Sequence, residues 1–581
     1  MTKFTLTLLD TTGIQDYIFN SNRLQENIGA SELVYRATTL WAFEALEKAI
    51  GKNHNIRDGG SLTWSFDETK QIEKDTSLQA EVIQAAGGNT LVLFRDKDNA
   101  IDFVKALTLR LLKEAPGLTI LAQHDHEFDF NAQKLTDARA SLFGKMGKHK
   151  LSRLHSAPTL GLSVTAVCSS TGLPAVTTPA GTQKIGKNEF PLLVPGQDEQ
   201  ESERNRLISR ETTFKLAARD LANERLKYTI GEVAKWYDFP SDIDNLGRIS
   251  GEESYVAVVH ADGNKMGDHV KDDVVKKVED KYGKEENKVK FNREYILASR
   301  EFSRKIEKAS RKTLVHIVEK IVASIDSDGM VAGRIPVVTV NTKTRKYNYI
   351  PFRPLVFGGD DVTFLCNGQL GVELATQYLK AFEIFSAEEG LNFHACAGVS
   401  IVKMHYPFSR AYKLSEELIK SAKKFVKEKV KEDKSAVDWH FAQSGLSGSL
   451  DVIRDREYSY TKENTKGEKI KYHLGLRPLV LRDQVQSWQS IEYIMSELQD
   501  EKPWSESHNK VVGLREPLRN GAKAVEQYRL NYDLPPLPDI AGDKAAQSGW
   551  LGTHCIYFDA IELLDHHVSL KMKAEDKNVS K

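Results

Sequence analysis

The stretch RPLVFGGDDVTFLC (353–366) decides the fold. Two apolar runs flank the turn Gly358-Gly359-Asp360-Asp361, and this pattern predicts a β-hairpin with two carboxylates at its tip. Glycine reaches backbone angles that are closed to other residues, so a phosphate can come close to such a turn. Taken alone, the turn also fits an ordinary surface hairpin. The rest of the sequence has to decide between these two interpretations.

A second strand that ends in an acid lies upstream. Residues 254–262 (SYVAVVHAD) predict a strand with Asp262 at its end, within the motif HADGNKMG (260–267). If this strand pairs with the hairpin, Asp262 comes beside Asp360 and Asp361. Converging carboxylates repel each other, and a divalent cation relieves that repulsion. Because Mg²⁺ prefers oxygen ligands and bridges carboxylates to phosphates, the pattern predicts two-metal phosphoryl or nucleotidyl transfer.

The same order of elements occurs twice along the chain. The first unit is predicted to contain strand 4–10, helix Ser31–Ile50, hairpin 80–96 with the turn Gly87-Gly88-Asn89, helix 99–114 and strand 118–123. The second is predicted to contain strand 254–262, helix 292–325, hairpin 353–366, helix 369–386, strand 392–402, helix 408–432 and strand 435–441. We interpret the two units as a divergent internal repeat of the α+β class.

Composition limits the class of protein. The 581 residues are 40% hydrophobic and 28% charged, as in an ordinary globular chain. Lys plus Arg and Asp plus Glu both number 81, and a net charge of zero argues against a generally basic nucleic-acid coat. None of the four cysteines makes a CxxC pair, so no zinc site or disulfide framework is expected. No apolar run of about 18 residues and no leader is seen, so we expect a cytoplasmic protein without a membrane span.

Four domains are expected from these patterns. They are a first palm-like domain (1–130), a mostly helical linking domain (131–250), a second palm with the catalytic hairpin (251–445) and a helical domain with a polar tail (446–581).

Several motifs together resemble a known family. The GGDD hairpin, the motif ADGNKMG and the stretch 394–441 look like the catalytic palm of the large, polymerase-like subunit of type III CRISPR effector complexes, of a type III-B-like form. Residues 8–34 resemble the first palm of that subunit, whose site is usually degenerate, and 513–529 resemble its terminal helical domain. The resemblance implies an α+β fold with two ferredoxin-like, nucleotide cyclase-like palms and helical domains around them.

The resemblance also implies an activity. It is a metal-dependent nucleotidyltransferase that converts ATP to a cyclic oligoadenylate, or a related adenylylated second messenger, when target RNA binds. The implied cofactor is Mg²⁺ or Mn²⁺. The implied partners are a backbone subunit, a small helical subunit, a repeat-processing-type subunit, guide RNA and target RNA.

Roles for individual residues follow from the same resemblance. Asp262 and Asp360 would hold the metals and Asp361 would assist. The nucleotide-binding residues would be Gly358 and Gly359 at the turn and Lys423 at the triphosphate. In the first palm, an acceptor nucleotide would be bordered by Gly13, Ile14, Gln15 and the turn Gly87-Gly88-Asn89.

This sequence departs from the family pattern in ways that leave alternatives open. Asn264 stands where the family commonly has a second acid, and an amide is a weaker metal ligand. The chain starts at the first palm, so the family's histidine-aspartate nuclease domain and cleavage of single-stranded DNA are not expected. The alternatives are a non-catalytic scaffold that binds nucleotide and RNA, and a stand-alone nucleotide cyclase resembling the GGDEF diguanylate cyclases.

Overall fold

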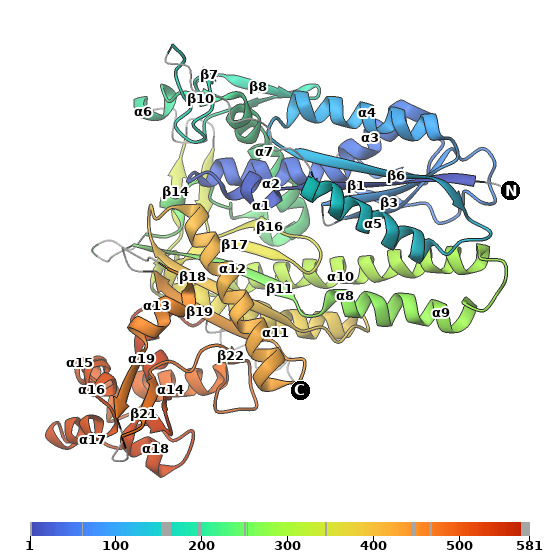
Figure 1. Ribbon diagram of the computed structural model, residues 1–581. Coiled ribbons are helices and arrows are strands. Elements are labelled where there is room, and N and C mark those ends of the chain that lie inside the picture. Colours follow the sequence, from blue (N-terminus) through green and yellow to red (C-terminus); the bar gives the residue numbers. More distant parts are fainter. Residues whose placement is uncertain are drawn as a thin grey trace.

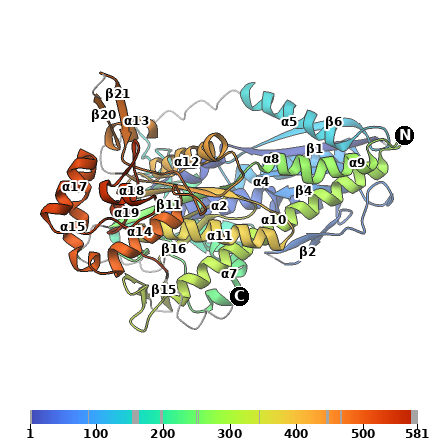
Figure 2. The same ribbon diagram turned by 90° about the horizontal axis from the view of Figure 1, so that it is seen from below.

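Two sheets share the same order of their first four strands. The computed structural model describes residues 3–60, 62–86, 88–152, 164–194, 200–248, 251, 254–342, 345–442, 448–463 and 467–570. Figure 1 shows the N-terminal sheet in blue above the central sheet in green to orange, with the C-terminal segment in red at one end. In the view from below, the C-terminal segment again lies beyond the end of the two sheets (Figure 2). No helix within these ranges is long and apolar enough to cross a membrane.

The first sheet has the order β4-β5-β1-β6, and all its neighbours are antiparallel. Its strands are β1 (Lys3–Thr12), β4 (Ala80–Ala86), β5 (Asn89–Phe94) and β6 (Thr119–Asp129). The helices of this unit are α1 (Ile14–Phe19), α2 (Leu24–Thr38), α3 (Leu40–Ile50), α4 (Lys97–Glu114) and α5 (Leu135–Ser152), and a small hairpin is formed by β2 (Ile56–Asp58) and β3 (Trp64–Phe66).

The second sheet repeats this order and extends it, as β16-β17-β11-β18-β19-β22. Its strands are β11 (Tyr255–Gly263), β16 (Phe352–Val356), β17 (Val362–Asn367), β18 (Ala395–Lys403), β19 (Ala436–Ala442) and β22 (Leu479–Val480). The main helices are α10 (Val289–Ala323), α11 (Gly371–Glu388) and α12 (Phe408–Phe425). Because the first four strands repeat the order of the N-terminal sheet, the predicted doubling and the α+β class are confirmed.

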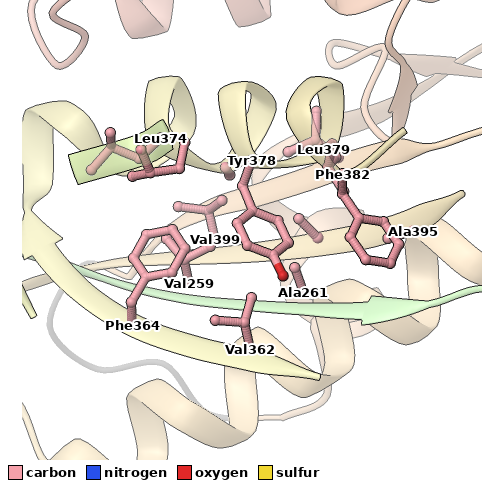
Figure 3. Close-up of a cluster of buried hydrophobic side chains, with 14 of the residues drawn as sticks. Val259, Ala261, Val362, Phe364, Leu374, Tyr378, Leu379, Phe382, Ala395 and Val399 are labelled. Atoms are coloured by element: carbon pink, nitrogen blue, oxygen red, sulfur yellow. The ribbon is translucent and has the colours of Figure 1, made fainter. Parts of the chain in front are cut away.

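Strand β11 is buried on both faces. Val256 and Val258 belong to one hydrophobic cluster, whereas Ala257 and Val259 belong to another. Such two-sided burial explains why this strand is an almost unbroken apolar run rather than an alternating one. Figure 3 shows helix α11 over one face, with Tyr378 and its neighbours above Val259 and Ala261. The carboxylate at the end of β11 therefore extends from a rigid support.

One hydrophobic cluster extends through both palms. Leu9 and Val92 of the first sheet belong to the same cluster as Val258 and Leu365 of the second. The hydroxyl of Ser31 on α2 also donates a hydrogen bond of 2.6 Å to the carbonyl of Leu355 on β16. The two palms are thus packed as one body.

The remaining described elements surround the two sheets. Between the two palms in the sequence come β7 (Ala175–Thr177), β8 (Thr182–Ile185), β9 (Asn188–Pro191), α6 (Glu201–Arg204), β10 (Ile208–Ser209) and the longer α7 (Arg210–Ile230). Insertions in the second palm are α8 (Met266–His269), the π-helical turn η3 (Val270–Lys276), α9 (Lys277–Tyr282), β12 (Met330–Val331), β13 (Ile335–Pro336), β14 (Val338–Asn341) and β15 (Lys346–Tyr349).

The C-terminal segment contains more than helices. Its helices are α13 (Leu450–Glu457), α14 (Trp488–Asp500), α15 (His508–Gly513), α16 (Arg515–Asn520), α17 (Ala522–Asn531), α18 (Asp543–Ser548) and α19 (Phe558–Leu563). A sheet of order β20-β21-β24-β23 is built from β20 (Ser459–Glu463), β21 (Lys469–His473), β23 (Trp550–Leu551) and β24 (His554–Cys555).

Two predicted helices differ from the structure. The helix expected over Ser31–Ile50 begins at Leu24 and is interrupted at Thr39, whose backbone is not helical (φ −127°, ψ −97°). The hydroxyl of Thr39 donates to the carbonyl of Tyr35, a local bond that competes with the helical pattern. The helix expected over 408–432 leaves α-helical geometry after Phe425 and ends in a π-helical turn, η5 (Val426–Val430).

Candidate active site

The predicted acidic residues lie at one end of the central sheet. The last pair in the β11–β17 register is Ala261 with Val362, so Asp262 and Asp361 are the next residues on the two strands. Gly263 then lies against the turn, because a Cβ placed on it would be 3.0 Å from the Cβ of Asp360. Pairing of these two strands thus brings together residues that are about one hundred positions apart in the sequence.

We call the place where Asp262, Asp360 and Asp361 meet the acidic corner, and there the pKa of the Asp360 carboxyl is raised. Burial raises its pKa, and the negative charge of Asp262 and then that of Asp361 raise it further, to about 6 from an ordinary value of 3.8. Lys423 acts in the opposite direction but does not offset these effects. The corner is therefore a place where negative charge is crowded and where a cation would be stabilised.

The predicted triphosphate lysine faces this corner. The Nζ atom of Lys423 lies 2.6 Å from Oδ2 of Asp262 and donates a hydrogen bond of 2.9 Å to the carbonyl of Gly263. About a third of each of the two charged side chains is exposed. Helix α12 thus holds one positive charge over the end of β11, within reach of solvent.

The turn itself is open. Gly358 and Gly359 have φ values of 127° and 75°, which favour glycine, and a Cβ at either position would meet no atom within 4 Å. The backbone of the turn is thus accessible.

Asp361 is held by a residue that the sequence analysis did not single out. Nε2 of His260 lies 3.0 Å from Oδ1 of Asp361. His260 is itself buried, and because side chains alternate along β11, the strand register is needed to show that its ring faces Asp361. Its ring also stacks on Tyr412 of α12, with ring centres 5.5 Å apart.

Tyr412 connects this site to the first palm. Its ring stacks on Phe19 of α1 at 3.8 Å, and the side chain of Gln15, also on α1, forms a hydrogen bond with Tyr412 that lowers its pKa. Burial and the charge of Asp361 outweigh this bond and raise the pKa of Tyr412 above its ordinary value. Gln15, one of the predicted acceptor residues, is thus joined to the second palm by this hydrogen bond.

The other acceptor residues surround a turn that is closed. A Cβ at Gly88 would lie 2.7 Å from Cδ1 of Ile14 and 2.8 Å from Oγ1 of Thr11, which itself donates to the Gly88 carbonyl. Gly13, with a φ of 69°, begins helix α1. Asn89 accepts a hydrogen bond from Gln84, and Gly87 lies outside the described residues. Ile14 and Gly88 are therefore brought together, and Gly13 comes directly before Ile14 in the sequence.

Asn264 has a structural role. Its amide donates 3.1 Å hydrogen bonds to Oδ1 of Asp433 and to the carbonyl of Lys434, and its backbone N–H donates to His394. The residue is 4% exposed. The Asn264 side chain, which stands where the family commonly has a second acid, thus ties the end of β11 to residues 433–434, between α12 and β19.

The donor set at this corner fits a divalent cation only in part. Asp262 and Asp360 supply oxygen ligands with crowded negative charge, which suits Mg²⁺ or Mn²⁺. However, the described residues contain no group of three or more His, Cys, Asp or Glu side chains placed to hold a metal ion. A cation bound here would need further oxygen ligands from water or phosphate, as is usual for Mg²⁺.

The contact between His260 and Asp361 leads to a testable expectation. His260→Phe keeps a ring on Tyr412 but removes the hydrogen bond to Asp361, so we expect the activity predicted from the sequence, turnover of ATP, to fall about tenfold with little change in KM. A double-mutant cycle with Asp361→Asn should show that the two changes are not additive. Full additivity in this cycle would contradict the positioning role.

Comparisons with known proteins find a family model that matches the central segment of the chain. A family model described as Cas10/Cmr2, second palm domain, matches residues 255–432. Among solved structures, the Csm1–Csm4 cassette in complex with pppApA is 14% identical, covers 98% of this chain and 70% of that chain, and has a TM-score of 0.49. The same cassette in complex with cA4 is 13% identical, with coverage of 97% and 70% and a TM-score of 0.48.

A third similar structure is the Csm1–Csm4 subcomplex in the type III-A CRISPR-Csm interference complex, at 14% identity, with coverage of 97% and 70% and a TM-score of 0.47. No curated protein matches the chain. The resemblance inferred from the sequence is confirmed for the segment that carries the acidic corner, because residues 255–432 match the second palm domain of Cas10/Cmr2.

Proposed function

We propose that this chain is a metal-dependent nucleotidyltransferase that joins ATP molecules at the acidic corner of its second palm. The product would be a cyclic oligoadenylate or a related adenylylated second messenger. The observation that carries this proposal is the placement of Asp262, Asp360 and Lys423 at one sheet end, within a segment that matches the Cas10/Cmr2 palm family. Carboxylates beside a lysine and an open glycine turn are what binding and transfer of a nucleoside triphosphate require.

The chain's own residues have separable tasks in this reaction. Asp262 and Asp360 would hold Mg²⁺ or Mn²⁺, which when bound supplies activation of the attacking hydroxyl and neutralises charge on the leaving pyrophosphate. Lys423 can exchange its contact with Asp262 for a phosphate oxygen of ATP. The open Gly358-Gly359 turn lets the phosphates approach the backbone. Asp361, oriented by His260, would assist.

The assembly in which this chemistry takes place is part of the same proposal. The chain would act in the cytoplasm as the large subunit of a type III CRISPR effector complex, with the other effector subunits and guide RNA. Binding of target RNA would start synthesis. This assignment is supported by the match of residues 255–432 to the Cas10/Cmr2 palm.

Labelled ATP tests the proposal directly. The purified chain is incubated with ATP and Mg²⁺ alone, within the assembled complex, and within the complex with target RNA. We expect adenylate oligomers only in the third condition. Product without RNA would instead identify a stand-alone cyclase, and no product in any condition would identify a non-catalytic scaffold.

Metal binding gives a further prediction, which does not depend on turnover. Because the pKa of Asp360 is about 6, this carboxyl is ionised at pH 7.5 and mostly protonated at pH 5. We expect 5 mM Mg²⁺ to raise the Tm of the chain by several degrees at pH 7.5 and by much less at pH 5. Asp360→Asn should lose the effect, and NaCl at matched ionic strength serves as the control. An equal Mg²⁺ effect in the variant would remove Asp360 from the metal site.

A further inference from the structure

The first palm contains an ion pair that repeats the one at the acidic corner. Nζ of Lys150 lies 2.6 Å from Oδ2 of Asp10. In the second palm, Nζ of Lys423 lies 2.6 Å from Oδ2 of Asp262. The same two atoms of the same two residue types thus meet at the same distance in both palms.

The two pairs occupy equivalent positions in the repeat. Strands β1 and β11 hold the same place in their sheets, each between the second hairpin strand and the strand that follows. Three residues after each aspartate, the backbone takes a positive φ, 69° at Gly13 and 52° at Lys265, where a helix begins.

The lysines also match along their helices. Lys150 follows Leu135, the first residue of α5, by 15 positions, and Lys423 follows Phe408, the first residue of α12, by the same 15. Helices α5 and α12 come directly after the fourth strand of their respective palms. A chance ion pair between a helix and a strand would not match both the strand position of the aspartate and the helix position of the lysine.

The carboxylates of the hairpin are not repeated. Asn89 and Thr90 follow the second glycine of the first palm where Asp360 and Asp361 follow that of the second. Thr90 is fully buried, and its hydroxyl donates to the carbonyl of Thr38. The first palm has therefore retained the cationic side chain but lacks the additional acids that would gather a divalent cation.

The surroundings of Lys150 leave room for a ligand. The lysine side chain is 34% exposed, about as much as Lys423 at 33%. Gly147, one helical turn before it, has no atom within 4 Å of the position where a Cβ would lie. The end of β1 that carries Asp10 continues into α1, which packs on α12 through Phe19 and Tyr412. Helix α1 thus connects the end of β1, where Lys150 of α5 lies, with helix α12, which carries Lys423.

We infer that Lys150 binds the phosphates of the second, acceptor nucleoside triphosphate, and that Asp10 holds the lysine in place when no nucleotide is bound. This inference rests on the proposed function, because it assigns a residue to one of that reaction's two substrates. Lys150 is a binding residue and takes no part in holding a metal. A purely structural pair, which would only fasten α5 to β1, is the competing explanation.

The two explanations differ in what each substitution does to nucleotide binding. Isothermal titration with α,β-methylene ATP and Mg²⁺, which cannot react, counts the nucleotides bound by the full chain. We expect two for the wild type, and for Lys150→Met a loss of the second site or at least a tenfold weaker affinity there. Asp10→Asn frees the lysine from a competing carboxylate, so affinity at that site should rise by about threefold or more.

Matched variants keep the result interpretable. Lys148→Met, an exposed lysine on the same helix, should leave both sites unchanged, whereas Lys423→Met should affect the other site. If Lys150→Met and Asp10→Asn both lower Tm but leave two sites of unchanged affinity, or if the wild type binds a single nucleotide, the inference is wrong. Because no turnover is measured, a chain that binds two nucleotides but makes no product would contradict the proposed function and not this assignment.

Discussion

Asp360→Asn is expected to reduce product formation from ATP by a factor of a thousand or more while making the folded chain more stable at pH 7.5. The carboxylate is a proposed metal ligand, and the amide binds cations far less well. Loss of charge stabilisation in the transition state typically costs several kcal/mol, which corresponds to this fall in rate. The measurement is conversion of labelled ATP by the complex with target RNA.

The rise in stability follows from the direction of the pKa shift. Because the folded chain raises the pKa of Asp360 from 3.8 to about 6, it binds the proton more tightly than the unfolded chain does. The free energy of unfolding therefore falls as pH rises through this interval, and the loss persists at pH 7.5. Removing the charge should restore about 1 to 2 kcal/mol after allowance for partial exposure.

The control for this variant is an aspartate close by that is not part of the corner. Asp268→Asn alters an exposed residue of α8, only six positions after Asp262. It should leave both activity and stability within error. Asp360→Asn with retained activity would show that the acidic corner has been assigned wrongly, whereas lost activity together with lost stability would indicate misfolding instead of a missing ligand.

Glu81→Ala is expected to destabilise the chain by about 3 to 5 kcal/mol, because it removes the buried carboxylate that Arg293 and Arg300 share. Glu81 is fully buried on β4 of the first palm. It accepts hydrogen bonds of 2.7 and 2.8 Å from Arg293, and of 2.9 Å from Arg300, both on α10 of the second palm. Denaturant unfolding at neutral pH measures the effect.

A neighbouring carboxylate on the same arginine provides the control. Glu68 also contacts Arg300 but is 46% exposed, so Glu68→Gln should cost well below 1 kcal/mol. Burial alone would raise the pKa of Glu81, but Arg293 and Arg300 outweigh it and hold the pKa below the ordinary value of 4.5. The contribution of Glu81 is thus present above pH 4.5 and is lost as pH falls further. Equal costs for the two variants would contradict the role of burial.

The placement of the acidic corner could be predicted because it depends on strong local signals. The apolar runs before Asp262 and on both sides of the GGDD turn are long enough to predict strands, and their end residues are then brought to one sheet edge by pairing. The doubled strand order was likewise predictable from two successive sets of similar elements. Both predictions use periodicity and turn chemistry, which are properties of neighbouring residues.

What could not be predicted depends on register and on contacts between distant segments. The bond between His260 and Asp361 exists because of the pairing of Ala261 with Val362, and a shift by one residue would turn the histidine to the other face. The structural use of Asn264 depends on where residues 433–434 return to the sheet. The break at Thr39 comes from a side-chain hydrogen bond that helical periodicity does not reveal.

Helix α12 has one end at each palm. Near its start, Tyr412 lies on Phe19 and the N–H of Phe408 donates to Asn22, both residues of the N-terminal half, whereas Lys423 near its other end lies over Asp262. At 1.5 Å per residue, this helix of 18 residues is a stiff rod of about 27 Å. A tilt of the N-terminal half against the second palm would therefore displace the ammonium group of Lys423. Helix α12 alone is sufficient to couple such a movement to the acidic corner.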